Sequence, residues 1–117
     1  MSVTRKDVAA LLMAPPPGFL LLDVRGPSET AGGIIDGARC IPLDSVAASL
    51  GMAPETHLET FGFPKPNLTD LIVAYCQAGR RAASACSSFQ AAGYSNCKVY
   101  PGSWGEWSSP PQSSLSS

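Results

Sequence analysis

Apolar residues gather in short runs that alternate with segments of helical periodicity. The runs lie at residues 19–24, 39–42, 71–75 and 96–100, and Gly, Pro or polar residues bound each of them. The run at 19–24 is apolar throughout its first four residues, which is typical of a strand that is covered on both faces. Val3 predicts one further, very short strand. The pattern therefore predicts a sheet of about five strands.

Helical spacing first occurs near the N-terminus. Val8, Leu11 and Leu12 recur at intervals of three and four residues, which predicts a helix over 5–13 with one buried face. Thr4 is a suitable N-cap, in a capping box with the acidic residue three positions on.

Five more helices are predicted further along the chain: over 27–31, from a cap at Asp44 or Ser45 to Leu50, over 55–61, from 81 to 93, and around Trp107. Strands that are separated by helices indicate an α/β domain, in which a parallel sheet has helices on both faces. A ligand is then expected beyond the carboxyl ends of the strands.

Size and composition fit one such domain. The 117 residues are 44% hydrophobic and only 15% charged, and the net charge is −1, so there is no reason to expect nucleic acid or an acidic membrane surface as a partner. No apolar run approaches the length of a membrane span. We expect a monomer with a folded domain over 1–108 and a disordered tail, rich in Ser and Pro, over 109–117.

Cysteine usage and the N-terminus bear on the compartment. The four cysteines include no C-x-x-C pair and have no histidine at metal-ligand spacing, and the N-terminus lacks the charged-then-apolar plan of a secretory signal. We therefore expect free thiols in a reducing compartment, the cytoplasm rather than the mitochondrion, and no metal or cofactor.

The segment Cys-Gln-Ala-Gly-Arg-Arg at 76–81 carries the clearest chemical arrangement. A six-residue turn between a strand and a helix can point several backbone N–H groups at one spot, and Arg80 and Arg81 add positive charge. The same field lowers the pKa of a thiol from about 8.5, which favours the thiolate of Cys76 near neutral pH. The segment predicts a sulfur nucleophile at the bottom of a pocket that attracts small anions. Its candidate residues are the nucleophile Cys76 and the substrate-binding residues Gln77, Ala78, Gly79, Arg80 and Arg81.

Other candidate residues have structural interpretations. Cys40, Cys86 and Cys97 lie in apolar patterns and predict core packing, although one of them could serve as a resolving thiol. His57 lies in an insertion rich in proline and is predicted to be a surface residue, so a cysteine–histidine catalytic pair is poorly supported.

The charged residues after the strand at 19–24 have two interpretations. Asp23 and Arg25 either line the mouth of the pocket or serve the structure, with Arg25 paired to Glu29 or bracing the loop; we favour the structural alternative. Near the C-terminus, Trp104 predicts a pocket wall or core packing equally well, and Trp107 predicts core packing.

The segment 76–81 resembles the C-x-x-G-x-R active loop of the single-domain rhodaneses, which are thiosulfate sulfurtransferases. Residues 22–25 resemble the family's L-[IL]-D-V-R strand end, 33–38 its G-H-I-P-G-A turn, and 93–107 its closing segment. Ile34 and Asp36 stand where the family usually has His and Pro, but the sulfur chemistry needs neither residue type. The Cys-Gln opening is most similar to the small thiosulfate–glutathione sulfurtransferases.

The resemblance implies a rhodanese-like fold and a reaction. The Cys76 thiolate takes the outer sulfur of thiosulfate as a persulfide, and then passes it to glutathione, cyanide or a protein thiol such as thioredoxin. Two alternatives use the same fold. In phosphatases and arsenate reductases the arginine stands six positions after the cysteine, where this chain has Ala82, so the loop is one residue short for phosphate. A non-catalytic sulfur-carrier or regulatory module is the other alternative, although such domains often lose the cysteine.

Overall fold

A central parallel sheet organises the molecule. The computed structural model describes residues 2–109. Its sheet has the order β2-β1-β3-β4, formed by β1 (Leu20–Asp23), β2 (Arg39–Cys40), β3 (Ile72–Tyr75) and β4 (Cys97–Val99). The register places Asp23 beside Tyr75 and Cys40, so β1, β2 and β3 end at one edge.

The sheet has four strands in the described part of the chain, where we predicted about five. The strand predicted at Val3 is reduced to one parallel bridge between Ser2 and Val99, with the Val3 N–H donating to the Val99 carbonyl at 2.8 Å. Thr4 already caps the following helix, so the chain turns away from the sheet before a longer strand can form.

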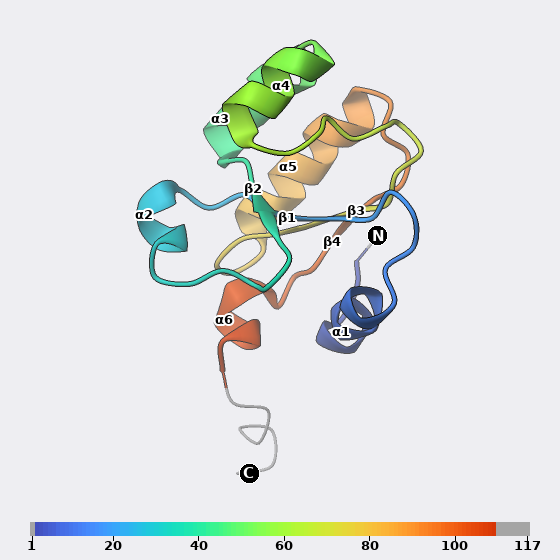
Figure 1. Cartoon of the computed structure of the whole chain (residues 1–117). Helices are drawn as coiled ribbons and strands as arrows, with labels where there is room; N and C mark the ends of the chain where they lie inside the picture. The colour runs from blue at the N-terminus through green and yellow to red at the C-terminus, as the bar shows by residue number, and fades with distance from the viewer. Residues whose placement is uncertain (1, 110–117) are drawn as a thin grey trace.

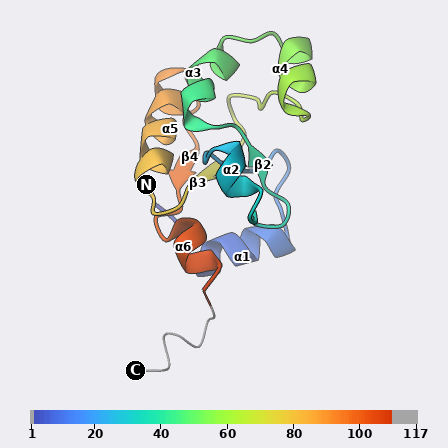
Figure 2. The same cartoon turned by 90° about the vertical axis from the view of Figure 1, so that its left-hand side faces the viewer.

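Helices cover both faces of the sheet, as the alternation of elements predicted (Figures 1 and 2). One core contains side chains of α3 (Leu43–Leu50), α4 (Pro54–Phe61) and α5 (Arg80–Ala91). The opposite core contains those of α1 (Arg5–Met13) and α6 (Ser103–Trp107). The short α2 (Pro27–Thr30) follows β1.

The predicted capping is confirmed for α1 but wrong for α3. Thr4 and Asp7 form the capping box that their spacing predicted. The N-cap of α3 is Pro42, which makes no side-chain cap bond, whereas Asp44 and Ser45 lie inside the first turn. The helix begins earlier than predicted because the Leu43 N–H is held by the Val24 carbonyl at 3.0 Å.

The prediction that His57 lies on the surface is wrong. His57 is only 1% exposed, and its Nδ1 lies 3.1 Å from the Phe63 carbonyl oxygen. Its ring packs against Phe61 and Phe63, with centroid distances of 5.0 and 5.1 Å. Gly62, with φ of +82°, ends α4 and turns the chain back over the histidine.

The cysteines differ in position. All four are free thiols. Cys86 of α5 and Cys97 of β4 are buried in the core, as predicted. Cys40 is only half-buried, with its Sγ 3.6 Å from the Arg25 carbonyl. Within residues 2–109, no helix combines the length and apolar character needed to cross a membrane.

Candidate active site

The loop at 76–81 joins the end of β3 to the start of α5. Gly79 is the N-cap of α5 and has φ of +101°, in the left-handed region that favours glycine. A Cβ atom at this position would lie 2.8 Å from the Pro101 carbonyl oxygen. The glycine is therefore required by its own conformation and by the close approach of the neighbouring chain.

The backbone N–H groups of this loop surround the Cys76 sulfur. The Gly79 N–H donates to Sγ at 3.0 Å. Burial raises the pKa of the Cys76 thiol, but hydrogen bonds from the N–H groups of Ala82, Ala78, Gly79 and Arg81 outweigh it, so the pKa lies below its ordinary value. Cys76 is only 1% exposed. The local field therefore stabilises a thiolate in a nearly enclosed position.

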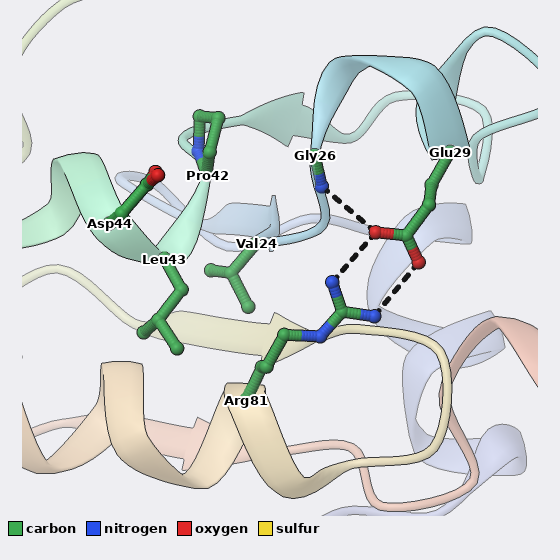
Figure 3. A pocket seen from close by; sticks show the side chains of 7 residues that line it. All are labelled: Val24, Gly26, Glu29, Pro42, Leu43, Asp44 and Arg81. Atoms are coloured by element: carbon green, nitrogen blue, oxygen red, sulfur yellow. Dashed lines mark hydrogen bonds and ion pairs between the residues drawn. The ribbon is translucent and has the colours of Figure 1, made fainter.

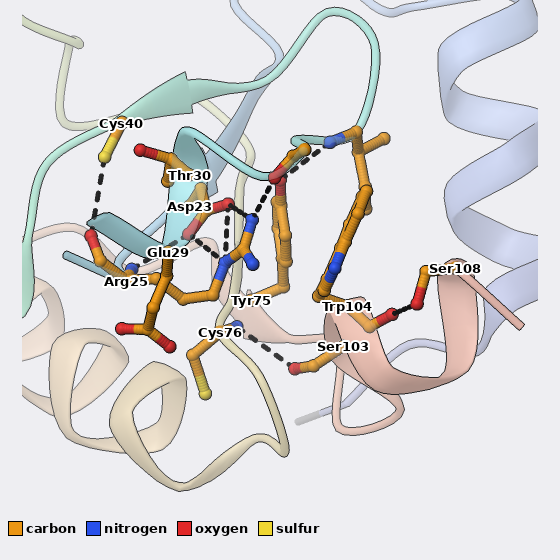
Figure 4. Close-up of polar contacts among 12 residues, drawn as sticks. Asp23, Arg25, Glu29, Thr30, Cys40, Tyr75, Cys76, Ser103, Trp104 and Ser108 are labelled. Carbon is orange, nitrogen blue, oxygen red and sulfur yellow. Dashed lines mark hydrogen bonds and ion pairs between the residues drawn. The ribbon is translucent and has the colours of Figure 1, made fainter. Parts of the chain in front are cut away.

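The N-terminal end of α6 binds the outer side of the loop (Figure 4). The Cys76 N–H donates to Ser103 Oγ at 3.1 Å, and this hydroxyl donates to the Tyr100 carbonyl at 2.8 Å. The N–H groups of Trp104 and Gly105 donate to the carbonyls of Cys76 and Gln77 at 2.9 and 3.0 Å. The first two carbonyl groups of the loop are therefore hydrogen-bonded to the N-terminal turn of α6.

Ser103 contacts the loop and was not among the candidate residues of the sequence analysis. It is fully buried and has φ of +56°, which is unusual for a residue other than glycine. Its position in the closing segment at 93–107 was the available signal, but sequence alone did not connect that segment with the loop.

Arg81 makes a bidentate ion pair with Glu29 of α2. Its two terminal nitrogens lie 2.7 and 2.8 Å from the carboxylate oxygens. This pairing and the Gly26 N–H lower the pKa of Glu29 to about 2. Sequence analysis considered Glu29 only as one possible partner of Arg25 and did not identify it as the partner of a loop residue.

Arg25 pairs with Asp23 instead, so the predicted Arg25–Glu29 pair is wrong. Its Nη2 lies 2.8 Å from Asp23 Oδ2 and also donates to the Gly33 carbonyl. The guanidinium lies 4.9 Å from the centroid of the Trp104 ring (Figure 4). Because both charges are buried, Asp23 and Arg25 brace the chain around the site, which agrees with the structural alternative.

The remaining loop side chains point outward, and a pocket lies beside Arg81. Gln77, Ala78 and Arg80 are exposed. The pocket has a volume of about 380 Å³, and its lining is Val24, Gly26, Glu29, Pro42, Leu43, Asp44 and Arg81 (Figure 3). Cys76 is not part of this lining, so the predicted position of the sulfur at the bottom of a pocket does not describe this cavity. Within residues 2–109, no three His, Cys, Asp or Glu side chains are grouped as metal ligands.

Comparison with known proteins identifies the family. The model of the rhodanese-like domain matches residues 4–110. A protein of Schizosaccharomyces pombe, provisionally named a mitochondrial thiosulfate sulfurtransferase, is 37% identical over 89 residues; the match covers 76% of this chain and 63% of that protein. The chain thus spans less than two thirds of that relative.

A human relative and a solved human structure are also similar. The thiosulfate:glutathione sulfurtransferase of Homo sapiens is 35% identical over 88 residues, which are 74% of this chain and 76% of the relative. The solved structure of the human single-domain sulfurtransferase TSTD1 has a TM-score of 0.85 and 32% identity, and covers 91% of this chain and 93% of its own. The fold, the loop and these relatives show that the chain belongs to the rhodanese-like domain family, close to members that are named sulfurtransferases.

Proposed function

We propose that the protein is a thiosulfate sulfurtransferase that works through a persulfide on Cys76. The observation that carries the proposal is the ring of backbone N–H groups around the sulfur, with the Gly79 N–H at 3.0 Å from Sγ. Such donors stabilise the thiolate before the reaction and the persulfide anion after it. The names of the relatives support the same reaction class.

The proposed first step is an attack of the Cys76 thiolate on the outer sulfur of thiosulfate. A new S–S bond forms to Cys76, the S–S bond of thiosulfate breaks, and its electron pair leaves with sulfite. The exposed Arg80 adds positive charge that attracts the dianionic donor. Gln77, Ala78, Gly79 and Arg81 complete the proposed substrate loop.

In the proposed second step, the outer sulfur of the persulfide passes to an acceptor. The acceptor thiolate attacks the outer sulfur of the persulfide, and the Cys76 thiolate leaves. Glutathione is the first candidate acceptor, because a human relative is named for it; thioredoxin and cyanide are further candidates. We also propose a monomer in the cytoplasm, where the four free thiols would remain reduced. Cell fractionation would distinguish this compartment from the mitochondrion, in which the fission yeast relative is named.

Thiocyanate formation from thiosulfate and cyanide tests the proposal. The wild type should form thiocyanate, and mass spectrometry after thiosulfate treatment should find one additional sulfur atom on Cys76. Cys76→Ser should abolish both. Cys40→Ser is the matched control, because β1 separates the strand of Cys40 from β3 and its loop and the Cys40 thiol is hydrogen-bonded to the Arg25 carbonyl; this variant should retain activity.

If Cys76→Ser formed thiocyanate at the same rate as the wild type, the proposed mechanism would be wrong. A persulfide that forms but passes to no acceptor would favour the alternative, a non-catalytic sulfur carrier or regulatory module.

A further inference from the structure

The pocket beside Arg81 has an electrostatic character different from that of the loop. The loop presents backbone N–H groups and the exposed Arg80, which suit an anion. The pocket presents the carboxylates of Glu29 and Asp44 together with Arg81. Donor and acceptor could therefore be attracted by opposite fields on neighbouring surfaces.

Asp44 supplies the charge that remains available in this pocket. Both terminal nitrogens of Arg81 are occupied by Glu29, so these two charges largely neutralise each other. Asp44 is exposed, and within residues 2–109 its carboxylate is in neither of the two ion pairs. A cationic group that enters the pocket therefore meets a carboxylate that, within residues 2–109, is in no ion pair.

Two residues of the pocket lining also belong to the surroundings of Cys76. Val24 packs in the same core cluster as Cys76, and its N–H donates to the carbonyl of Tyr75, the residue directly before Cys76, at 3.0 Å. Arg81 lines the pocket, while its backbone N–H is among the groups that stabilise the thiolate. A ligand in the pocket is thus next to the end of the loop.

The pocket also offers an apolar surface. Figure 3 shows Leu43 and Val24 between Asp44 on one side and the Arg81–Glu29 pair on the other. A short chain of methylene groups can cover these two side chains, with an ammonium group at one end beside Asp44 and a thiol at the other.

We infer that this pocket binds the sulfur acceptor and that Asp44 selects an acceptor thiol that carries a primary ammonium group. This inference rests on the proposed sulfurtransferase function. The ammonium group pairs with Asp44, and the acceptor thiolate attacks the outer sulfur of the persulfide. The S–S bond of the persulfide breaks, its electron pair returns to Cys76, and the acceptor leaves as a persulfide.

Glutathione and N-acetylglutathione test the inference. They differ only at the amino group, which is remote from the thiol, so their thiols have similar nucleophilicity. Sulfite release at saturating thiosulfate gives kcat/KM for each acceptor. The wild type should prefer glutathione by about threefold to fivefold, the upper part of the range expected for one solvent-exposed charge pair. Asp44→Asn should reduce this preference below about twofold, and high salt should reduce it in the wild type.

Asp36→Asn is the matched control, because it removes an exposed carboxylate that is not part of the pocket lining. It should retain the wild-type preference. An equal preference in the wild type and Asp44→Asn, or an equal loss in both variants, would overturn the inference. Mass spectrometry of Cys76 separates this failure from that of the proposed function: if the persulfide forms but the preference is absent, only the acceptor assignment fails, whereas without a persulfide both fail.

Discussion

The two sides of the loop at 76–81 use similar polar groups in different surroundings. On one side, which we call the sealed side, Asp23, Arg25 and Ser103 are at most 1% exposed. On the other, the open side, Glu29, Asp44 and Arg81 line a pocket. Each side holds an acid–arginine pair, but the side chains of Asp23–Arg25 are 0% and 2% exposed and those of Glu29–Arg81 are 36% and 37% exposed.

The exposure of each acid–arginine pair to solvent determines whether it contributes mainly to stability or to ligand binding. A buried charge that loses its partner is left without water, so the sealed pair is tightly coupled to folding. Exposed charges are screened and contribute little to stability, but they remain accessible to a ligand. We therefore expect sealed-side variants to change mainly stability, and open-side variants to change mainly reactivity and selectivity.

The largest effect is expected for Asp23→Asn. The variant leaves the Arg25 guanidinium buried without a compensating charge, and the free energy of unfolding should fall by about 3–5 kcal/mol. Urea denaturation measures this loss. Asp36→Asn, at an exposed site, should change it by less than about 0.5 kcal/mol. A loss below about 1 kcal/mol in Asp23→Asn would contradict the distinction between the two sides.

Ser103 should give the next largest effect. Ser103→Ala removes the oxygen that accepts from the Cys76 N–H, and an unsatisfied buried donor costs about 1–3 kcal/mol. Ser103→Gly removes the same oxygen but suits the φ of +56°, so it should be more stable than the alanine variant by about 1 kcal/mol. Urea denaturation compares the two, and the reverse order would show that the backbone conformation is not strained.

Open-side variants should move the pKa of the Cys76 thiol in opposite directions. Arg81→Gln leaves Glu29 uncompensated near the sulfur and should raise this pKa, whereas Glu29→Gln leaves Arg81 uncompensated and should lower it. Each shift should be up to about 0.5 pH units, or about 0.7 kcal/mol. The rate of iodoacetamide alkylation against pH measures them, with Cys76→Ser as the blank. If both variants shifted the pKa of the Cys76 thiol in the same direction, the cause would be distortion of the loop rather than the changed charge.

The smallest effect is the loss of the Glu29–Arg81 pair in acid. The pKa of Glu29 is about 2 in the folded protein, below its ordinary 4.5, so the pair contributes fully above about pH 4.5 and is lost as the pH falls toward 2. Because both side chains are more than one third exposed, the contribution is only about 0.2–1 kcal/mol. The difference in unfolding free energy between wild type and Glu29→Gln should therefore shrink between pH 5 and pH 2; a constant difference would show that the carboxylate acts through another contact.

Local patterns predicted most of the fold. The helix over 5–13 and its capping box depend on residues that lie close together in the chain, and they match α1. The buried runs match β1 and β3 because a strand covered on both faces needs apolar residues throughout. The errors occurred where a distant group intervened: the Val24 carbonyl starts α3 before its predicted cap, and the chain after Gly62 folds back to bury His57.

The sequence by itself determined the α/β alternation and the position of a cysteine in a glycine- and arginine-containing turn after the central strand, because spacing, propensity and turn chemistry are local properties. Only the tertiary structure decided the partners of that turn. Arg81 pairs with Glu29, and Arg25 does not. The Cys76 N–H donates to Ser103, and Asp44 lines the same pocket as Arg81 and Glu29. Arg81 and Glu29 are 52 positions apart in the chain, and Ser103 and Cys76 are 27 positions apart. The parallel strand order brings them to one edge of the sheet.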